Sequence, residues 1–263
     1  LLLRWYGSHF ILFLHNHGIM ATAAGNMAIP KGTWYGNIFV MLRQLLVFTK
    51  PITNQIFDGG VNLYCGMLAV LTMFLYLFVK EHPWKKFRKY VLLVLLVISF
   101  NHGTLNYIWH GMHDQYGIPN RFSFVFIFVL LVMAYDAVQS ITEIDIYFVI
   151  SSILLAGAFA FACKQQAGAT IGKYTLPASL VLLVIYGVTC CLRTSKKITH
   201  ATYISVIGSV CLVELVANAA YGFSENGYCH YKKYYKTSPA VTEANVRVRE
   251  MAEENRQAFI VRN

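Results

Sequence analysis

The sequence predicts an all-α membrane protein, a polytopic bundle of transmembrane helices. Of its 263 residues, 57% are hydrophobic and only 13% are charged, whereas soluble globular proteins carry about 25% charged residues. The apolar residues also gather in runs close to the roughly 20 residues that a helix needs to cross a hydrocarbon core. This composition excludes collagen-like, coiled-coil and disordered chains, and it does not suit an ordinary cytosolic enzyme.

The apolar runs predict about seven membrane spans within residues 1–220. The first candidate, 8–29, is weak because His15, Asn16 and His17 interrupt it. The remaining predicted spans are 63–79, 90–109, 122–140, 146–163, 176–192 and 201–220. Most linkers between them are short, so we expect neighbouring spans to run antiparallel.

The basic residues predict which ends of the spans face the cytoplasm. The chain has 22 Lys and Arg against 12 Asp and Glu, a net charge of +10. In a soluble chain this excess would suggest nucleic acid, but here it lies between apolar runs, most densely in 80–89 and 193–200. The positive-inside rule makes these linkers cytoplasmic. The intervening segments are then extracytoplasmic: 30–62, 110–121, 164–175 and the tail 221–263.

Two of these outer segments have further features. The middle of 30–62 is apolar over 38–48 apart from Arg43 and Gln44, which predicts an interfacial or re-entrant helix at the outer face. The tail 221–263 is expected to begin an extracytoplasmic soluble region. Because the chain starts without Met and stops within a polar stretch, we expect a fragment of a longer protein.

Polar residues concentrate at the predicted outer end of span 90–109 and in the linker after it. They are Asn101, His102, Asn106, His110, His113, Asp114, Asn120 and Arg121. Because His102, Asn106 and His110 are four residues apart, a continuous helix would stack them on one face over about 12 Å. Such a stripe suits a groove open to the outside, and the alternative is a set of hydrogen bonds between helices of the bundle.

The residue types in this cluster suit a phosphate-bearing substrate. Arg121 can clamp a phosphate bidentately, or it can instead anchor the following span at the lipid headgroups. His110 is a candidate acid–base helper near neutral pH, and the catalytic residues are otherwise unknown. The predicted substrate-binding residues are Arg121, His110, Asn106, His102 and Asn101. In the last span, Glu214 and Asn218 form an i,i+4 pair that could add to the same cavity.

One metal-site candidate follows the same span. The pattern H-x-x-H-D at His110, His113 and Asp114 has ligand types that suit a divalent metal. No distant ligand confirms it, and hydrogen-bonded loop residues are the alternative. The six cysteines include no C-x-x-C pair, so neither a zinc knuckle nor a redox motif is indicated. We therefore predict no metal site and no cofactor. If the protein does use a cofactor, a divalent metal is the one candidate.

Several short runs combine Asn, Gly and aromatic residues near the predicted outer face. They are NLYCG at 62–66, SFN at 99–101, LNYIWHG at 105–111 and PNRFSF at 119–124. Together they resemble the bacterial YfhO family of membrane proteins. The resemblance covers roughly 60–263 and includes the end of the last span around Asn218.

The YfhO family is similar to the GT-C class of glycosyltransferases. The resemblance implies a GT-C-like enzyme of the bacterial plasma membrane that transfers a sugar from a polyprenyl-phosphate donor to a cell-envelope polymer such as teichoic acid. GT-C enzymes usually carry their catalytic carboxylate in an early outer loop, which implies that the general base lies before Leu1. The implied partners are the lipid bilayer, the lipid-linked sugar and the polymer acceptor, with no nucleic acid.

Two other functions stay open from the sequence. A transporter or flippase for the same lipid-linked sugar would also place polar residues along a span. It should carry them to the inner side, however, where the halves of 90–109 and 122–140 are apolar apart from Asp136. A non-catalytic subunit of envelope assembly would keep the bundle without needing the outer polar groups.

Overall fold

The computed structural model describes residues 32–52, 60–112, 120–167, 172–226, 243 and 246–253. The long helices are α4 (Pro83–Asn101), α6 (Ser123–Gln139), α7 (Ile146–Ala167), α8 (Thr175–Thr194) and α9 (His200–Asn226). The shorter elements are α2 (Ile38–Leu42), α3 (Met67–Leu75), α5 (Gly103–Trp109) and the 3-10 turns η1 (Arg43–Leu45), η2 (Tyr76–Phe78) and η3 (Ile141–Glu143). The predicted first span, 8–29, lies outside the described residues.

The chain divides into two compact units, 1–225 and 226–263. The first unit holds the helices named above. In the second unit, residues 243 and 246–253 are helical. That this tail begins an extracytoplasmic region stays a prediction.

The predicted fold class is confirmed, because the chain is an all-α membrane protein. Among the described helices, three are long and apolar enough to cross a membrane: Ile146–Gln166, Thr175–Thr194 and His200–Glu225. Two shorter apolar helices accompany them, Met67–Phe78 and Ser123–Gln139. In the described parts of the chain, the one departure from helical regular structure is an isolated β-bridge between Trp34 and His102.

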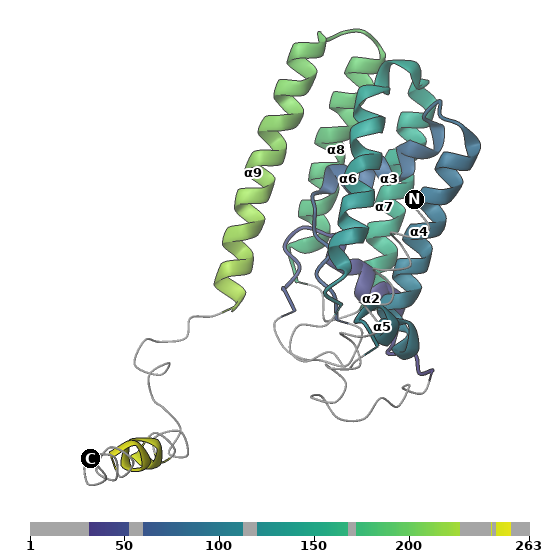
Figure 1. The fold of residues 1–263 in the computed structure, drawn as a ribbon. Coiled ribbons are helices and arrows are strands. Elements are labelled where there is room, and N and C mark those ends of the chain that lie inside the picture. The colour runs from purple at the N-terminus through teal and green to yellow at the C-terminus, as the bar shows by residue number, and fades with distance from the viewer. Residues whose placement is uncertain are drawn as a thin grey trace, which may run out of the picture. The chain divides into compact units, whose positions relative to one another are not determined.

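The long helices of the first unit stand side by side and are joined at two opposite ends (Figure 1). We call the end with the turns 79–82, 140–145 and 195–199 the basic end, and the opposite end, which holds α2 and α5, the α5 end. The described parts of linkers that the sequence assigns to opposite sides of the membrane therefore lie at opposite ends of the bundle. Which side of the membrane each end faces stays a prediction.

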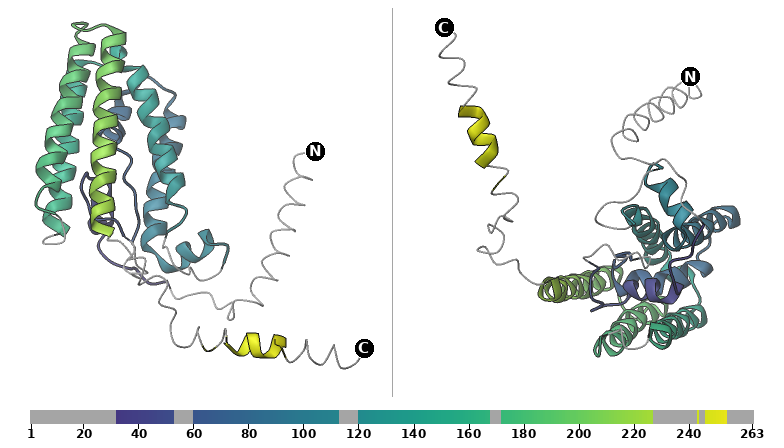
Figure 2. Two further views of the ribbon diagram at one scale, coloured as in Figure 1. Left: turned by 90° about the vertical axis from the view of Figure 1, so that its left-hand side faces the viewer. Right: turned by 90° about the horizontal axis from the view of Figure 1, so that it is seen from below.

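The apolar segment 38–48 packs into the bundle rather than along its surface. α2 and η1 cover its first part, and Figure 2 shows α2, in purple, among the longer helices. Met41, Leu45 and Val47 are buried, and α2 contacts α7. Of the two possibilities open from the sequence, the structure therefore favours the re-entrant one.

The predicted continuous helix over 90–109 is not formed, and this expectation was wrong. α4 ends at Asn101, and α5 begins at Gly103. Between them, His102 has extended backbone angles, with φ −119° and ψ 119°. The polar residues of this region therefore do not form a stripe along one face of a single helix.

Backbone hydrogen bonds from a distant segment cause the break. The amide of Tyr35 donates to the carbonyl of Asn101, and the amide of Gly103 donates to the carbonyl of Thr33, both at 2.9 Å. Through these bonds, backbone groups next to His102 gain hydrogen-bond partners. A continuous helix would have supplied such partners from within itself. The α4–α5 joint is thus stabilised by residues about 70 positions earlier in the sequence.

α3 is shorter than the predicted span 63–79, because nonhelical backbone precedes it. Residues 60–66 enter the bundle without helical structure, and Val61 and Leu63 are buried there. The helix begins after Gly66, whose φ of 105° is a conformation that side chains other than glycine rarely adopt. Part of the backbone inside the apolar bundle therefore needs hydrogen-bond partners from side chains.

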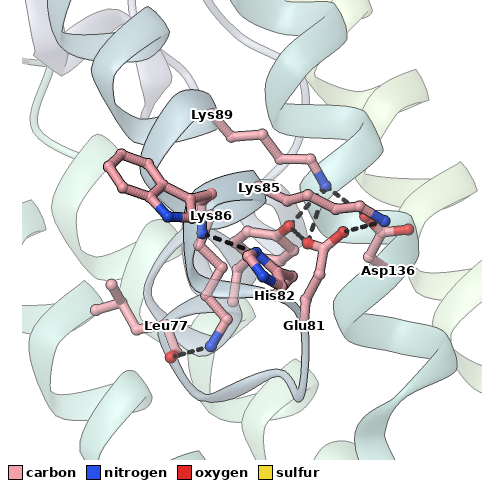
Figure 3. Close-up of polar contacts among 9 residues, drawn as sticks. Leu77, Glu81, His82, Lys85, Lys86, Lys89 and Asp136 are labelled. Atoms are coloured by element: carbon pink, nitrogen blue, oxygen red, sulfur yellow. Dashed lines mark hydrogen bonds and ion pairs between the residues drawn. The ribbon is translucent and has the colours of Figure 1, made fainter.

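Ion pairs join α4, α6 and the turn 79–82 at the basic end (Figure 3). Lys89 Nζ donates to Asp136 Oδ2 at 2.8 Å and to the Tyr76 hydroxyl at 2.6 Å, and it lies 3.4 Å from Glu81 Oε2. Asp136 is thus paired with a lysine. Between this cluster and the α5 end, α4 and α6 contribute buried apolar residues: Leu93, Leu96, Phe126, Leu130, Met133 and Ala134.

α7 and α8 approach each other closely at Gly187. A Cβ atom at this position would lie 2.4 Å from Cδ1 and 2.7 Å from Cγ1 of Ile153 on α7. An isoleucine in a helix has essentially one favourable χ1 rotamer, so it cannot easily move away. Close packing through small residues is the usual basis of helix association in membranes.

We expect Gly187→Ala to destabilise the protein by about 1–3 kcal/mol, the usual cost of overpacking a core. Gly208→Ala on α9 is the matched control, because nothing lies within 4 Å of the position that a Cβ atom would take there. The control should be neutral or stabilising by up to about 1 kcal/mol, since alanine favours helix over glycine. Thermal unfolding in detergent measures both, and equal melting temperatures would contradict the α7–α8 packing.

Candidate functional site

Asn101, the last residue of α4, binds the backbone of Gly36 with both ends of its amide. Its Oδ1 accepts from the Gly36 amide at 3.1 Å, and its Nδ2 donates to the Gly36 carbonyl at 2.9 Å. Asn101 is buried, whereas Gly36 is exposed. This predicted substrate-binding residue therefore fixes the segment before α2 against the end of α4.

His102 caps α5. Its Nδ1 accepts from the amide of Leu105 at 3.4 Å, and its ring packs edge-to-face on Trp34 with 5.0 Å between ring centroids. The ring also lies beside Gly32, where a Cβ would come within 3.2 Å of Nε2. His102 is half-buried and belongs to the same joint as Asn101.

Asn106 and Asn120 connect α5 to the chain before α6 and to the entry of α3. The Asn106 amide donates to Asn120 Oδ1, and Asn120 Nδ2 donates to the carbonyl of Gly60 at 2.8 Å. Both asparagines are buried. Asn120 has a positive φ of 53°, a left-handed conformation that asparagine tolerates better than most residues. A buried amide pair thus fixes the backbone directly before Arg121.

His110 is the C-cap of α5 and packs into an aromatic cluster. Its Nδ1 lies 2.8 Å from the carbonyl oxygen of Asn106, so this nitrogen carries the proton and donates. Its ring lies edge-to-face on Phe122 at 5.6 Å, and Trp109 stacks on the same ring at 5.2 Å. The other ring nitrogen, Nε2, is buried. Proton transfer through His110 would therefore require this packing to open.

Arg121 is exposed, unlike its two neighbours Asn120 and Phe122, which are buried. It lies one residue before Phe122, the N-cap of α6. The N-terminal end of a helix carries a partial positive charge that adds to the field of a nearby guanidinium. Arg121 is thus an exposed residue between two buried neighbours at the start of α6.

The structure brings Asn106, His110 and Arg121 together through Asn120 and Phe122. It places Asn101 and His102 at the neighbouring α4–α5 joint, where their contacts are to residues 32–36 and to α5 itself. The alternative interpretation of these polar residues was that they form hydrogen bonds inside the bundle. Both Asn101 and Asn106 form such bonds. Substrate binding by the set stays a prediction, and Arg121 is its exposed member.

The metal-site candidate cannot be placed in full, because His113 and Asp114 lie outside the described residues. Within the part of the chain that is described, no group of three or more His, Cys, Asp or Glu side chains could hold a metal ion. His110 contacts Asn106 and Phe122, as given above.

Glu214 is the centre of a second polar cluster, which the sequence indicates only in part. Its Oε1 accepts from the Tyr64 hydroxyl at 2.5 Å and from the Met67 amide at 2.6 Å, and its Oε2 accepts from the Tyr186 hydroxyl at 2.6 Å. The side chain is only 3% exposed. One carboxylate of α9 therefore binds the first amide of α3 and a tyrosine of α8.

Asn218, one turn later on α9, has a similar role. Its Oδ1 accepts from the Phe48 amide at 2.8 Å, and the Phe48 carbonyl accepts from Thr175 Oγ1 at 2.8 Å. The polar character of Glu214 and Asn218 within a span is visible in the sequence. Their partners are not, because Tyr64, Tyr186 and Phe48 lie far away along the chain.

Replacing Asn101 tests whether it is primarily structural. We expect Asn101→Ala to destabilise the protein by about 1–3 kcal/mol, because two hydrogen bonds at a buried amide are lost. Asn62→Ala is the control, since its amide makes the same pair of bonds to the backbone of Ile52 but is exposed. Water can replace the lost bonds there, so unfolding in detergent should change by much less. Equal melting temperatures for wild type and Asn101→Ala would contradict this role.

Comparison with known proteins bears on the whole chain. A family model described as "Bacterial membrane protein YfhO" matches residues 8–261. Searches of curated proteins and of solved structures give no match. The family match includes both polar clusters and the basic end of the bundle. Because it extends over nearly the entire sequence, this chain belongs to the YfhO family of bacterial membrane proteins.

Proposed function

We propose that this chain is part of an integral membrane glycosyltransferase of the bacterial plasma membrane. It would transfer a sugar from a polyprenyl-phosphate donor to a cell-envelope polymer such as teichoic acid, at the outer face. The proposal is supported by membership of the YfhO family and by the likeness of that family to GT-C glycosyltransferases. The observation that carries it is the position of Arg121.

Arg121 suits the phosphate of a lipid-linked donor. The donor's hydrocarbon chain stays in the bilayer, so its phosphate is held near the membrane surface. Arg121 is exposed at the α5 end beside the start of α6, and the guanidinium and the helix N-terminus both favour an anion. The buried bond between Asn106 and Asn120 fixes the backbone that presents it.

The chemistry requires charge stabilisation more than protonation of the leaving group. The acceptor hydroxyl attacks the anomeric carbon, the bond from that carbon to the phosphate oxygen breaks, and the electron pair stays on the phosphate. A fixed cation beside that oxygen stabilises the charge as it develops. The hydroxyl proton passes to a general base.

The apolar middle of α4 and α6 supports transfer rather than translocation along these two helices. A path for a sugar phosphate needs polar groups at every depth. Between Lys89 and the α5 end, the buried residues of α4 and α6 include Leu93, Leu96 and Leu130. The polar groups of the α5 end are thereby separated from the ion pairs of the basic end.

We expect Arg121→Ala in the full-length protein to lower the rate of polymer glycosylation by about 100-fold or more, the usual cost of removing one group that stabilises a developing anion. Arg121→Lys should recover part of the rate, because it keeps the charge but not the bidentate geometry. Arg88→Ala at the basic end is the control and should leave the rate unchanged. Full activity of Arg121→Ala at normal expression would remove Arg121 from the mechanism and favour a non-catalytic role.

Orientation is tested separately with single cysteines in a variant that lacks the six native ones. On intact cells, a membrane-impermeant maleimide should label Lys173→Cys between α7 and α8 and should not label Lys197→Cys between α8 and α9. The reason is that the linker 193–200 is rich in basic residues, which stay in the cytoplasm. Labelling of Lys197→Cys alone would invert the orientation and move Arg121 to the cytoplasmic face.

A further inference from the structure

The short helix α5, at one end of the bundle (Figure 1), turns polar groups inward and apolar side chains outward. Its inward side carries Asn106 and Tyr107, which are buried. On its other side Leu105 is half-buried, and Ile108 and Trp109 are 49% and 40% exposed. A helix on the surface of a water-soluble protein shows the opposite arrangement, with its apolar side against the core. α5 therefore presents to its surroundings the side that a helix in water buries.

The end of α5 fixes one further apolar residue beside this side. The Gly111 amide donates to the Ile108 carbonyl at 3.1 Å, and the Met112 amide donates to the Tyr107 carbonyl at 3.0 Å. Together with the positive φ of Gly111, these bonds form the Schellman motif that commonly ends a helix. Met112 is exposed there. We call the outward residues the α5 patch: Leu105, Ile108, Trp109 and Met112.

Trp109 turns its polar atom into the bundle. Its indole N–H donates to Ser99 Oγ at 3.0 Å, and Ser99 is buried. One face of the ring stacks on Phe122, and Phe122 stacks in turn on Phe100 with 4.9 Å between ring centroids. A tryptophan at a membrane–water boundary usually keeps its N–H toward the wet side. Because Ser99 binds the N–H of Trp109, the part of the ring that remains exposed is apolar.

The α5 patch continues the apolar outer side of α4. Val91 and Leu95 are exposed on α4, and Ser99 follows at the same spacing of four residues. Residues at this spacing lie on one side of a helix. Since Trp109 covers Ser99 and bonds to its hydroxyl, the Trp109 ring extends the row that Val91 and Leu95 begin.

The patch also adjoins the apolar outer side of α6. Phe124, Phe128 and Leu131 are exposed along this helix. Their row begins two positions after Phe122, the residue on which Trp109 stacks. In a membrane protein, exposed apolar rows on long apolar helices face lipid. The α5 patch is thus continuous with two surfaces that face lipid.

The composition of the patch favours hydrocarbon over water. All four side chains are apolar apart from the indole N–H, which Ser99 binds. Exposing such surface to water costs about 25 cal/mol per Å², and contact with lipid chains carries no such cost. Contiguous exposed apolar patches mark contacts with a membrane or a protein. Continuity with α4 and α6 favours the membrane of these two.

We propose that the α5 patch is embedded in the hydrocarbon of the leaflet at the α5 end, which makes α5 an interfacial helix. This inference rests on the membrane location of the protein and does not depend on sugar transfer. The two sides of α5 then have separate tasks. Asn106 holds Asn120 on the inward side, and the outward patch sets the depth of this part of the chain in the bilayer. Arg121, next to Asn120, is thereby held near the boundary where lipid phosphates lie.

Depth-dependent quenching tests the proposal. A fluorescent amino acid replaces Ile108 in the full-length protein by stop-codon suppression, and the protein is placed in nanodiscs of phosphatidylethanolamine and phosphatidylglycerol. Lipids brominated near the ester end of their chains should remove most of the emission, and iodide in the water should remove little. Quenching by iodide alone would put the patch in water. Protection from both quenchers would show that protein, such as a second copy of the chain, covers it. Either result would overturn the proposal.

Two further positions calibrate the measurement. The same fluorophore at Phe128, exposed in α6, should respond to brominated lipid. At Lys173, an exposed charged residue in the linker before α8, it should respond to iodide. Met112 is the second position in the patch and covers the case in which the protein labelled at Ile108 does not fold. Equal responses at the patch and at Lys173 would contradict the assignment.

The two proposals fail in different experiments. Quenching by brominated lipid at Ile108, in a protein whose Arg121→Ala variant glycosylates normally, would keep the interfacial helix and reject Arg121. Loss of glycosylation in Arg121→Ala, with iodide quenching at Ile108, would keep the proposed function and reject the interfacial helix.

Discussion

Nonhelical backbone inside an apolar bundle needs hydrogen-bond partners, and this need determines much of the structure. Water cannot satisfy amides and carbonyls at that depth, so side chains must do so. Asn120 binds the buried Gly60, and Glu214 binds the buried Met67. The polar residues within the spans are therefore explained first by the backbone that they hold.

The same constraint positions the candidate site. The nonhelical segment at 60–66 is tied to Asn120, and Asn120 is tied in turn to Asn106 on α5. Arg121 follows directly in the sequence, so its backbone inherits the rigidity of this pair while its side chain remains exposed. Stability and the proposed phosphate contact thus depend on the same short stretch of chain. The Asn120 side chain serves stability, and the Arg121 side chain serves the phosphate contact.

Hydropathy was sufficient to predict the helical membrane fold, because apolar runs of sufficient length have few other uses. The cluster of polar residues before α6 was also visible, as was the unusual pair Glu214 and Asn218. The break at His102 was not predictable from periodicity, since the pattern of four fits a continuous helix. It arises from bonds to Thr33 and Tyr35, and no local sequence signal reports a partner so distant.

The bond between Tyr186 and Glu214 has a mechanical consequence. A phenol ring is rigid and its hydroxyl binds a carboxylate that is already fixed by two other donors. The distance between α8 and α9 at this level is then set by the length of the Tyr186 side chain. α9 cannot move away from α8 without breaking this hydrogen bond.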